Sequence, residues 1–455
     1  MTLKAIDLFA GAGGLSEGFE AAGVHVALAQ ELHPQPGLTH ALNHHNTPVV
    51  VGDVREVDTE VLRAVLARHG TVGEIDVIIG GPPCQGFSSA GKKQQNDPRN
   101  SLFGHFCRVV EAFRPKAIVF ENVPGFRKAY NGHVYEEARC AFDAAGYDLE
   151  DQILNAANYG VPQGRQRFIM VGVRKDLGLK FRWPEATHSS KTAGLFDAPY
   201  KALVTVQEAL SDLEFVQPGF EGHGYLQPAA SAYQRARRAN AIALFNHLAT
   251  RHRPKAVAMF KHIPEGGTIS QVPAAIRSAK RTMARLDRRG ISNAVLALPD
   301  DLIHYSQHRI PSVREMARLQ SFDDDYVFIG KRTSGFKERK VDVPQYTQVG
   351  NSVPPLLAKA IATAVIEMLG GQPEDLRRLN ERREVANLVH GSSARAGYTL
   401  DGKSVVPLYN LGGEPLPLPI DVCAPRVVDM PPLVEWVAAE RVGLKRQWMP
   451  EALAS

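Results

Sequence analysis

Cys84 is the residue of this chain best placed to act as a nucleophile. It follows a β-branched run at 77–79, typical of a strand buried on both faces, and the stiff Gly-Gly-Pro-Pro turn at 80–83. In an open α/β sheet, ligands bind at the carboxyl ends of the strands, so this turn predicts a thiol displayed at the reactive edge. An isolated cysteine is more often a small buried hydrophobe. Two prolines before it and Gly86 after it favour the nucleophile instead.

A sheet has to position that thiol, and the first 175 residues alternate strand and helix patterns. Helical patterns stand at 15–22, 101–113 and 135–145. Strand-like runs stand at 5–9, 25–29, 49–51, 77–79, 117–120 and 168–171. Strict alternation of elements of this length predicts an α/β fold with a doubly wound, mainly parallel sheet.

The residues around Cys84 resemble the catalytic loop of the cytosine-C5 DNA methyltransferases, which use S-adenosylmethionine. The resemblance is carried by Gly-Pro-Pro-Cys-Gln-Gly-Phe-Ser at 81–88 and Asp-Pro-Arg-Asn-Ser-Leu-Phe at 97–103. Further blocks follow in the family's order, through residue 370. The resemblance implies a class I methyltransferase fold, Rossmann-like, with a smaller target-recognition domain. It also implies methylation of cytosine C5 in a specific sequence of double-stranded DNA, by base flipping and a covalent Cys84 intermediate.

Glu121, in Phe-Glu-Asn-Val at 120–123, ends the next predicted strand and so lies on the same edge as Cys84. By itself such a glutamate could be solvated or could cap a helix. A thiolate adds to C6 of cytosine readily only if the ring accepts charge, and a proton or strong hydrogen bond at N3 provides that. The resemblance therefore implies that Glu121 is the general acid, with burial raising its pKa, and places Asn122 beside it.

Two arginines, Arg165 and Arg167, lead into the predicted strand at 168–171. Arginines at alternate strand positions point to one face, and they could simply be surface residues at a sheet edge. The resemblance assigns the cytosine O2 to Arg167 and gives Arg165 a supporting role near the base or backbone. A fixed guanidinium suits both the carbonyl and the charge that builds up on the ring.

A glycine-rich loop at 9–15 joins the first predicted strand to the first helix. By itself it could belong to a dinucleotide-binding fold, but Ser16 stands where that fingerprint has its third glycine. Asp-Leu-Phe-Ala-Gly-Ala-Gly-Gly at 7–14 resembles the family's cofactor loop. The resemblance implies that Phe9 stacks on adenine, Glu31 accepts from the ribose hydroxyls and Asp53 accepts from the adenine amino group. The implied cofactor-binding residues are Asp7, Phe9, Gly11, Gly13, Gly14, Leu15, Glu31, Asp53, Val54, Pro83, Leu102, Asn351 and Val353.

Basic residues are concentrated between 231 and 293. This region holds 13 Lys/Arg against 2 Asp/Glu, whereas the rest of the chain has 40 against 46. One charge cluster is usually a solvated helical face, but a contrast this large favours a surface that neutralises phosphates. The predicted DNA-binding residues are Arg235, Arg237, Arg238 and Arg251, with Gln85 and Ser88 on a loop that closes over DNA.

We divide the chain into a catalytic, cofactor-binding domain at 1–179, a target-recognition domain at 180–340, a returning helix at 341–370 and an extension at 371–455. Asn351 and Ser352 are expected to cap the returning helix, and Gly370 to end it. The charges of 312–322 are expected to be structural. The extension could be an interaction arm or a packed addition.

The composition excludes several classes of protein. With 44% hydrophobic and 22% charged residues, the chain is typical of a globular protein. Its four cysteines form no Cys-x-x-Cys pair, so neither a metal site nor a disulfide framework is expected. No apolar run reaches membrane-spanning length. We expect a cytoplasmic monomer that binds double-stranded DNA, serves restriction-modification or phage defence, and has defence-system partners.

Two alternatives remain open at this point. A relative with the same fold methylates cytosine in transfer RNA, but this chain lacks the Cys-Phe-Thr element of those enzymes and carries a basic insertion instead. A catalytically silent DNA-binding scaffold would keep the fold alone. The presence of Cys84, Glu121 and Arg167 argues against the scaffold.

Overall fold

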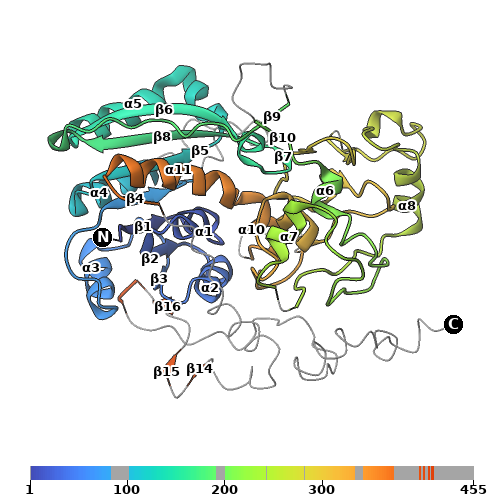
Figure 1. Cartoon of the computed structure of the whole chain (residues 1–455), viewed down its shortest axis with the longest axis horizontal. Helices are drawn as coiled ribbons and strands as arrows, with labels where there is room; N and C mark the ends of the chain where they lie inside the picture. Colours follow the sequence, from blue (N-terminus) through green and yellow to red (C-terminus); the bar gives the residue numbers. More distant parts are fainter. Residues whose placement is uncertain are drawn as a thin grey trace.

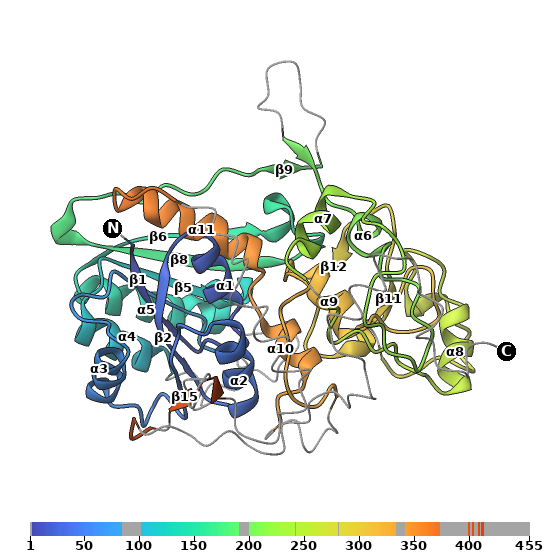
Figure 2. The same ribbon diagram turned by 60° about the horizontal axis from the view of Figure 1, so that its bottom comes forward.

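The computed structural model of the chain has a larger lobe built on a central sheet and a smaller lobe of short helices and strands beside it (Figure 1). The second view keeps the two lobes apart in the same way (Figure 2). Three predicted site residues, Cys84, Gln85 and Ser88, lie outside the described residues. The structure describes residues 2–83, 102–190, 200–241, 243–280, 282–333 and 342–373, with short stretches at 399–400, 403–404, 408–409 and 411–413.

The central sheet has the strand order β16-β3-β2-β1-β4-β5-β8-β6. All neighbours from β16 to β5 pair in parallel, whereas β8 is antiparallel to both β5 and β6. The doubly wound, mainly parallel sheet predicted from the sequence is therefore confirmed. Its strands are β1 (Lys4–Leu8), β2 (His25–Glu31), β3 (Val49–Val51), β4 (Val77–Gly80), β5 (Ala117–Asn122), β6 (Tyr147–Asn155), β8 (Gln166–Arg174) and β16 (Leu408–Tyr409).

Helices cover both faces of this sheet. On one face, α1 and α11 share a core with Ala5, and on the other α3, α4 and α5 share a core with Ile6. Ala5 and Ile6 are neighbours in β1 yet lie in opposite cores, because side chains alternate along a strand. The helices of the larger lobe are α1 (Gly14–Ala21), α2 (Pro34–Asn43), α3 (Thr59–Arg68), α4 (Leu102–Phe113), α5 (His133–Ala144) and α11 (Pro355–Met368).

The returning helix begins later than the sequence predicted. Asn351 is the last residue of α10 (Gln345–Asn351), and the Ser352 hydroxyl donates to the Gln348 carbonyl at 2.7 Å instead of capping α11. The expectation that Asn351 and Ser352 cap this helix is therefore wrong. A residue before proline disfavours the helical conformation, so Pro354 delays the start until Pro355, whose missing N–H is harmless in the first turn. Gly370, with φ of +77°, ends the helix as expected.

Only one stretch of the described chain, Gln345–Met368, is long and apolar enough by composition to cross a membrane. Of its most apolar window, 72% is buried inside the protein. The break between α10 and α11 also divides it into two separate helices. The stretch is therefore accounted for as a core element, since core helices of globular proteins meet the same criterion.

The smaller lobe, defined here as the described residues from 200 to 351, consists of short helices and two-residue strands. Thr205 caps α6 in a capping box with Glu208. The helices are α6 (Val206–Leu210), α7 (Ala232–Arg238), α8 (Pro254–Lys261), α9 (Val313–Leu319) and α10. Within the lobe, β11 (Ala284–Arg285) pairs with β13 (Leu302–Ile303). Its strands β10 (Lys201–Ala202) and β12 (Ser292–Asn293) pair with β9 (His188–Ser189) and β7 (Gln163–Gly164), which precede the lobe in the sequence.

Buried ion pairs hold the smaller lobe together around α9. Arg318 contacts Asp212 at 2.9 Å and also pairs with Asp324, and all three side chains are inaccessible to solvent. Arg309 pairs with Glu315 at 2.6 Å, and both of these side chains are also inaccessible to solvent. The charges of 312–322 are thus structural, as the sequence indicated.

Part of the C-terminal extension packs on the sheet. β16 pairs with β3, with Tyr409 opposite Val50, and the Tyr409 side chain is buried. Arg68 of α3 donates to the Gly413 carbonyl at 2.7 Å and lies over the Tyr409 ring. Between the two possibilities that the sequence left open, these residues behave as a packed addition to the fold.

Candidate active site

Predicted site residues from distant parts of the chain meet at the carboxyl edge of the parallel strands. This edge is where open α/β sheets bind ligands, because the strand ends and the loops after them are not covered by neighbouring strands. The residues brought there are Phe9 after β1, Glu31 at the end of β2, Asp53 after β3, Pro83 after β4 and Glu121 near the end of β5.

Glu121 and Arg167 form an ion pair at this edge. The Nε of Arg167 lies 2.7 Å from Oε1 of Glu121, and each side chain is 12% exposed. The pairing of β5 with β8 sets this contact, since Glu121 stands opposite Ile169. Burial raises the pKa of Glu121, while Arg167 and Arg165 act in the opposite direction. Glu121 is thus a carboxyl group whose pKa is raised although a fixed cation lies beside it.

The backbone that leads to Cys84 is fixed against Glu121. A Cβ at Gly81 would lie 2.5 Å from Oε2 of Glu121, so glycine allows this approach without displacing the carboxyl group. Asn122 is buried, donates to the Pro82 carbonyl at 3.3 Å and accepts from the Val123 amide at 2.8 Å. The described chain is therefore aligned with Glu121 up to Pro83, the residue directly before Cys84.

Arg165 has a different position from Arg167. It lies between β7 and β8, is buried, and donates to the carbonyls of Val295 and Gly350, each at 2.7 Å, and of Ser352 at 3.1 Å. These carbonyls belong to the smaller lobe and to the junction of α10 and α11. Arg165 thus holds the junction between the two lobes. It acts on Glu121 through its charge, which acts to lower the Glu121 pKa.

The glycine loop after β1 has a physical reason for each of its glycines. Gly11 and Gly13 have φ of +56° and +90°, a region that glycine adopts readily. A Cβ at Gly14 would lie 2.3 Å from the Val353 carbonyl, so this position needs glycine for close approach to the start of α11. Val353 and Leu15 are buried, whereas Asn351 is exposed. The loop therefore packs directly against the residues that lead into α11.

Glu31 holds the open side of that loop. Its carboxylate accepts from the Gly11 amide and from the His33 amide, both at 2.9 Å, and burial raises its pKa. No described atom lies within 4 Å of where a Cβ at Gly11 would stand. Space beside a buried acceptor suits a ligand that carries hydroxyl groups.

Asp53 already has a partner in this structure. Arg55 forms an ion pair with its carboxylate and lowers its pKa. Val54, the residue after Asp53, is buried, and its carbonyl accepts from Arg108 at 2.9 Å. Leu102, at the start of α4, is also buried. Any contact of Asp53 with a ligand amino group therefore competes with, or adds to, Arg55.

Asp7 lies behind the loop and is fully buried. Its Oδ2 accepts from the Ser16 hydroxyl at 2.7 Å, and Nε2 of His40 lies 2.9 Å from the same hydroxyl. Burial raises the pKa of Asp7 to about 7. No local sequence pattern predicts this polar network, because His40 stands in a different helix from Ser16. Its parts are recognisable only once α1 and α2 are placed together.

The predicted DNA-binding arginines fall into two groups. Arg237 pairs with Asp323 at 2.9 Å, and Arg238 contacts Asp212 at 3.3 Å and lies 3.5 Å from the centre of the Tyr225 ring. Arg235 and Arg251 are exposed, and within the described ranges neither has an ion pair. The latter two are thus available to a ligand, while Arg237 and Arg238 are engaged inside the lobe.

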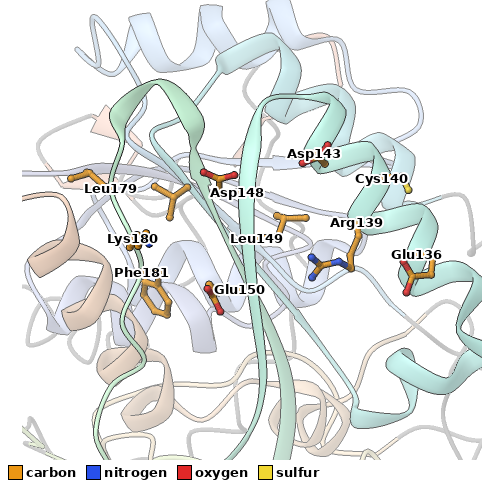
Figure 3. A pocket seen from close by; sticks show the side chains of 11 residues that line it. Glu136, Arg139, Cys140, Asp143, Asp148, Leu149, Glu150, Leu179, Lys180 and Phe181 are labelled. Carbon is orange, nitrogen blue, oxygen red and sulfur yellow. The ribbon is translucent and has the colours of Figure 1, made fainter.

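A cavity of about 560 Å³ lies away from this edge (Figure 3). Side chains from α5, β6 and residues 179–181 line it, among them Arg139, Asp148 and Glu150. Asp148 pairs across the sheet with Val173, near the far end of β8 from Arg167. The cavity therefore has no part in the chemistry at Glu121. No group of three or more His, Cys, Asp or Glu side chains that could hold a metal occurs in the part of the chain that the structure describes.

Comparison with known proteins gives a consistent family. The family model described as C-5 cytosine-specific DNA methylase matches residues 3–367. The Type II methyltransferase M.DdeI of Desulfomicrobium norvegicum is 34% identical over 85% of this chain and 95% of its own length. The Type II methyltransferase M1.HphI of Haemophilus parahaemolyticus is 35% identical over 81% and 88%, respectively.

Solved structures show the same fold. A prophage-encoded E. coli protein named as a DNA modification methyltransferase superposes with a TM-score of 0.62 at 27% identity, covering 81% of this chain and all of that one. The Dnmt2 methyltransferase of S. pombe superposes with a TM-score of 0.50 at 16% identity, covering 81% of this chain and 99% of that one. The second likeness concerns the fold alone.

Proposed function

The chain belongs to the C-5 cytosine-specific DNA methylase family, and on this premise we propose that Cys84, Glu121 and Arg167 carry out its reaction, the methylation of cytosine C5 in DNA. The observation that carries this assignment is the Glu121–Arg167 pair at 2.7 Å, which faces the backbone leading to Cys84. A proton-holding carboxyl, a cation and a thiol at one strand edge are the groups that the reaction needs.

The reaction needs a nucleophile because C5 of cytosine does not attack a methyl group unaided. The Cys84 thiolate adds to C6 while Glu121 gives N3 a proton or a strong hydrogen bond, and C5 becomes enamine-like. S-adenosylmethionine supplies the methyl group to C5. A base from solvent then takes the C5 proton, the electrons of the C5–H bond form the C5–C6 double bond and expel the Cys84 thiolate, and N3 returns its proton to Glu121, so that the enzyme regains its starting state.

Arg167 is proposed to hold the cytosine O2. Its Nε donates to Glu121 and its Nη1 donates to the Gln166 carbonyl at 2.8 Å, which fixes the plane of the guanidinium. A planar group with five donors retains N–H groups for a carbonyl acceptor. In this position Arg167 orients Glu121 and stabilises the charge that develops on the ring.

The glycine loop and Glu31 fit S-adenosylmethionine. Glu31 is a buried acceptor beside open space at Gly11, as a ribose diol requires, and Phe9 stands half-buried at the start of the loop. We propose that Asp53 receives the adenine amino group once Arg55 yields part of its carboxylate. Asn351, at the exposed end of α10, and Val353 complete the proposed pocket.

The smaller lobe is proposed to recognise the target sequence and to hold the base outside the duplex. Extruding a cytosine costs on the order of a few kcal/mol, which contacts in the pocket must offset. Exposed basic residues such as Arg235 and Arg251 are suited to contact the phosphates, together with Gln85 and Ser88 from the loop that follows Cys84.

We further propose that the enzyme protects DNA within a restriction-modification system. The relatives M.DdeI and M1.HphI are both named Type II methyltransferases. In this role the protein acts as a monomer on cytoplasmic DNA, with a cognate nuclease or another defence component as its functional counterpart. Methylated sites recovered from cells that express the chain would identify the target sequence.

The test uses duplex DNA in which 5-fluorocytosine replaces cytosine. After methyl transfer no C5 proton remains to be removed, so Cys84 should stay attached to DNA in a denaturation-resistant adduct that depends on S-adenosylmethionine. Cys84→Ser should abolish the adduct and turnover while keeping cofactor binding. An adduct through Cys140 would overturn the assignment.

Two controls complete this test. Cys107→Ser should form the adduct normally, because Cys107 is buried and burial raises its pKa to about 12. Radiolabelled methyl transfer to duplex DNA and to transfer RNA should give label in the DNA alone. Transfer to RNA alone would favour the alternative substrate, and no transfer despite cofactor binding would favour a silent scaffold.

A further inference from the structure

The smaller lobe reaches the cofactor loop through Tyr326. The Tyr326 hydroxyl donates to the Ala12 carbonyl, in the middle of the loop, although the two residues are 314 positions apart. Ala12 is itself part of the smaller lobe's hydrophobic core, in which Tyr326 is also buried. The conformation of the loop therefore depends on where this lobe is seated.

The Tyr326 ring is held rigidly. It packs against Phe322 and Phe328, with ring centres 4.7 Å and 5.3 Å away. The hydroxyl lies 3.1 Å from Nε2 of His44, and Nδ1 of His44 pairs with Glu20 of α1. All these groups are buried, so the hydroxyl is fixed from the smaller lobe and from the larger lobe together.

Gly13 makes room for this contact. A Cβ at Gly13 would stand 2.6 Å from the Tyr326 hydroxyl and 2.7 Å from Nε2 of His44. The glycine also has φ of +90°, a backbone conformation that other residues adopt at a cost. The bend of the cofactor loop and the position of Tyr326 are thus adapted to one another.

The hydrogen-bond roles follow from the groups themselves. A carbonyl oxygen can only accept, so the single hydroxyl proton of Tyr326 is directed to Ala12. Nε2 of His44 lies 3.1 Å from the same hydroxyl and is its second buried polar neighbour. Removing the hydroxyl would leave the buried Ala12 carbonyl and the buried imidazole each without this partner, in a loop that has to approach the cofactor.

We propose that Tyr326 is a positioning residue that couples the recognition lobe to the cofactor loop. Seating the lobe on DNA stabilises the loop conformation that binds S-adenosylmethionine, and an occupied loop stabilises the seated lobe, because coupling between two binding sites is reciprocal. The inference rests on the proposed function of the loop as the cofactor site. It adds a side chain from outside that loop as a determinant of cofactor affinity.

The test compares Tyr326→Phe with Tyr346→Phe. Tyr346 belongs to the same core, is equally buried, and donates its hydroxyl to the Pro311 carbonyl at 2.9 Å. Each variant therefore loses one buried hydroxyl and keeps its ring, but only Tyr326 touches the cofactor loop. This pairing separates loss of coupling from loss of stability.

The measurements are kcat, the KM for S-adenosylmethionine, and the Kd of S-adenosylhomocysteine with and without duplex DNA. For Tyr326→Phe we expect KM and Kd to rise about 5- to 10-fold, the effect of one lost hydrogen bond, with kcat changed less than about twofold. The tightening of S-adenosylhomocysteine binding by DNA should shrink by a similar factor. Tyr346→Phe should leave all four quantities as in the wild type.

Two results would overturn the coupling. One is an unchanged KM and an unchanged effect of DNA on S-adenosylhomocysteine binding in Tyr326→Phe. The other is an equal rise of KM in both variants, which would make the effect one of general stability. A wild-type protein that binds S-adenosylhomocysteine but methylates no DNA would contradict the proposed reaction instead, and the Kd comparison would still decide the role of Tyr326.

Discussion

Two arginine–glutamate pairs in this molecule consist of the same groups, but the pKa of the glutamate is shifted in opposite directions. Glu121 pairs with Arg167 at the sheet edge, where both side chains are 12% exposed, and burial raises its pKa. Glu315 pairs with Arg309 inside the smaller lobe, where neither is exposed. Burial acts to raise the pKa of Glu315 as well, but Arg309 and His304 outweigh it and hold the pKa well below the usual range.

The number of donors explains the difference. Glu315 accepts from Nη1 and Nη2 of Arg309 at 2.6 and 2.7 Å and from the Ser312 amide at 2.7 Å, which satisfies both oxygens. Glu121 has the Arg167 Nε on Oε1, while Oε2 faces Gly81. A buried carboxylate with several donors is a structural anion. One with fewer donors can hold a proton for a substrate, so the number of donors among the described residues distinguishes the proposed catalytic carboxyl from the structural one.

The largest expected effect concerns Glu121. Glu121→Gln keeps the shape of the side chain but cannot transfer a proton to N3, so kcat should fall about 10²- to 10⁴-fold while the KM for S-adenosylmethionine changes little. Single-turnover methylation of duplex DNA measures this. Glu150→Gln, an exposed glutamate on β6, should behave as the wild type. Equal losses in the two variants would contradict the assignment.

The pH dependence of the rate gives a second test of Glu121. Because its folded-state pKa is raised, the protonated form persists above the ordinary value of 4.5. The rate should fall as pH rises through that raised pKa, since only the protonated carboxyl can donate to N3. Glu121→Gln should lack this descending limb. A rate that rises through the same range would show that the ionised carboxylate is the active form.

The next effect is on stability and concerns the other member of the comparison. Glu315→Gln leaves Arg309 buried without its counter-ion and should lower the free energy of unfolding by about 3–5 kcal/mol, with kcat of the folded fraction nearly unchanged. Glu208→Gln is the matched control, because Glu208 stands at the same position of the exposed capping box of α6. Its loss should stay below about 1 kcal/mol.

Acid should remove the same contribution of Glu315. The folded-state pKa of Glu315 is depressed, so its stabilising effect is present above the ordinary value of 4.5 and is lost as pH falls through the folded-state value. The difference in unfolding free energy between wild type and Glu315→Gln should therefore shrink below about pH 4.5. For Glu121, whose pKa is raised, the pH dependence is the opposite one: its contribution to stability is present at low pH and is lost as pH rises through the folded-state value. Urea titrations at several pH values measure both.

The smallest expected effect separates free from engaged arginines. Arg235→Gln and Arg251→Gln should each lower the slope of log K against log salt by about 0.9, the value for one phosphate contact, and leave the melting temperature unchanged. Arg237→Gln should lower the melting temperature and leave the salt slope unchanged, because Arg237 pairs with Asp323. Fluorescence anisotropy across a salt series gives the slopes. A full slope change for Arg237→Gln would mean that its internal pair opens on DNA.

Local patterns predicted most of the larger lobe. The β-branched runs at 77–79 and 117–120 form buried strands because alternating side chains enter two cores, and the glycines at 11, 13 and 14 meet local backbone or spatial demands. Glu121 and Arg167 could be placed together because each stands at the end of a recognisable strand and in a motif of the family. The proposed catalytic pair thus follows from information close to each residue.

Contacts between distant segments could not be predicted in this way. Tyr326 meets Ala12 only after the smaller lobe folds back on the loop, and no pattern near either residue marks the contact. The engaged state of Arg237 likewise depends on Asp323, which stands in another part of the lobe. The false cap at Ser352 had a local cause, since Pro354 imposed a restriction that outweighed its capping preference.

The edge strand β16 affects the order in which this protein can be completed. Strands β1 to β5 come from the first 122 residues, but the strand that covers β3 stands at Leu408–Tyr409. During synthesis at about 5–20 residues per second, the apolar β3 edge has to wait roughly 15 to 60 s for its neighbour. An uncovered edge can pair with another chain. The nascent methylase is therefore most exposed to self-association after its sheet has formed and before its last segment leaves the ribosome.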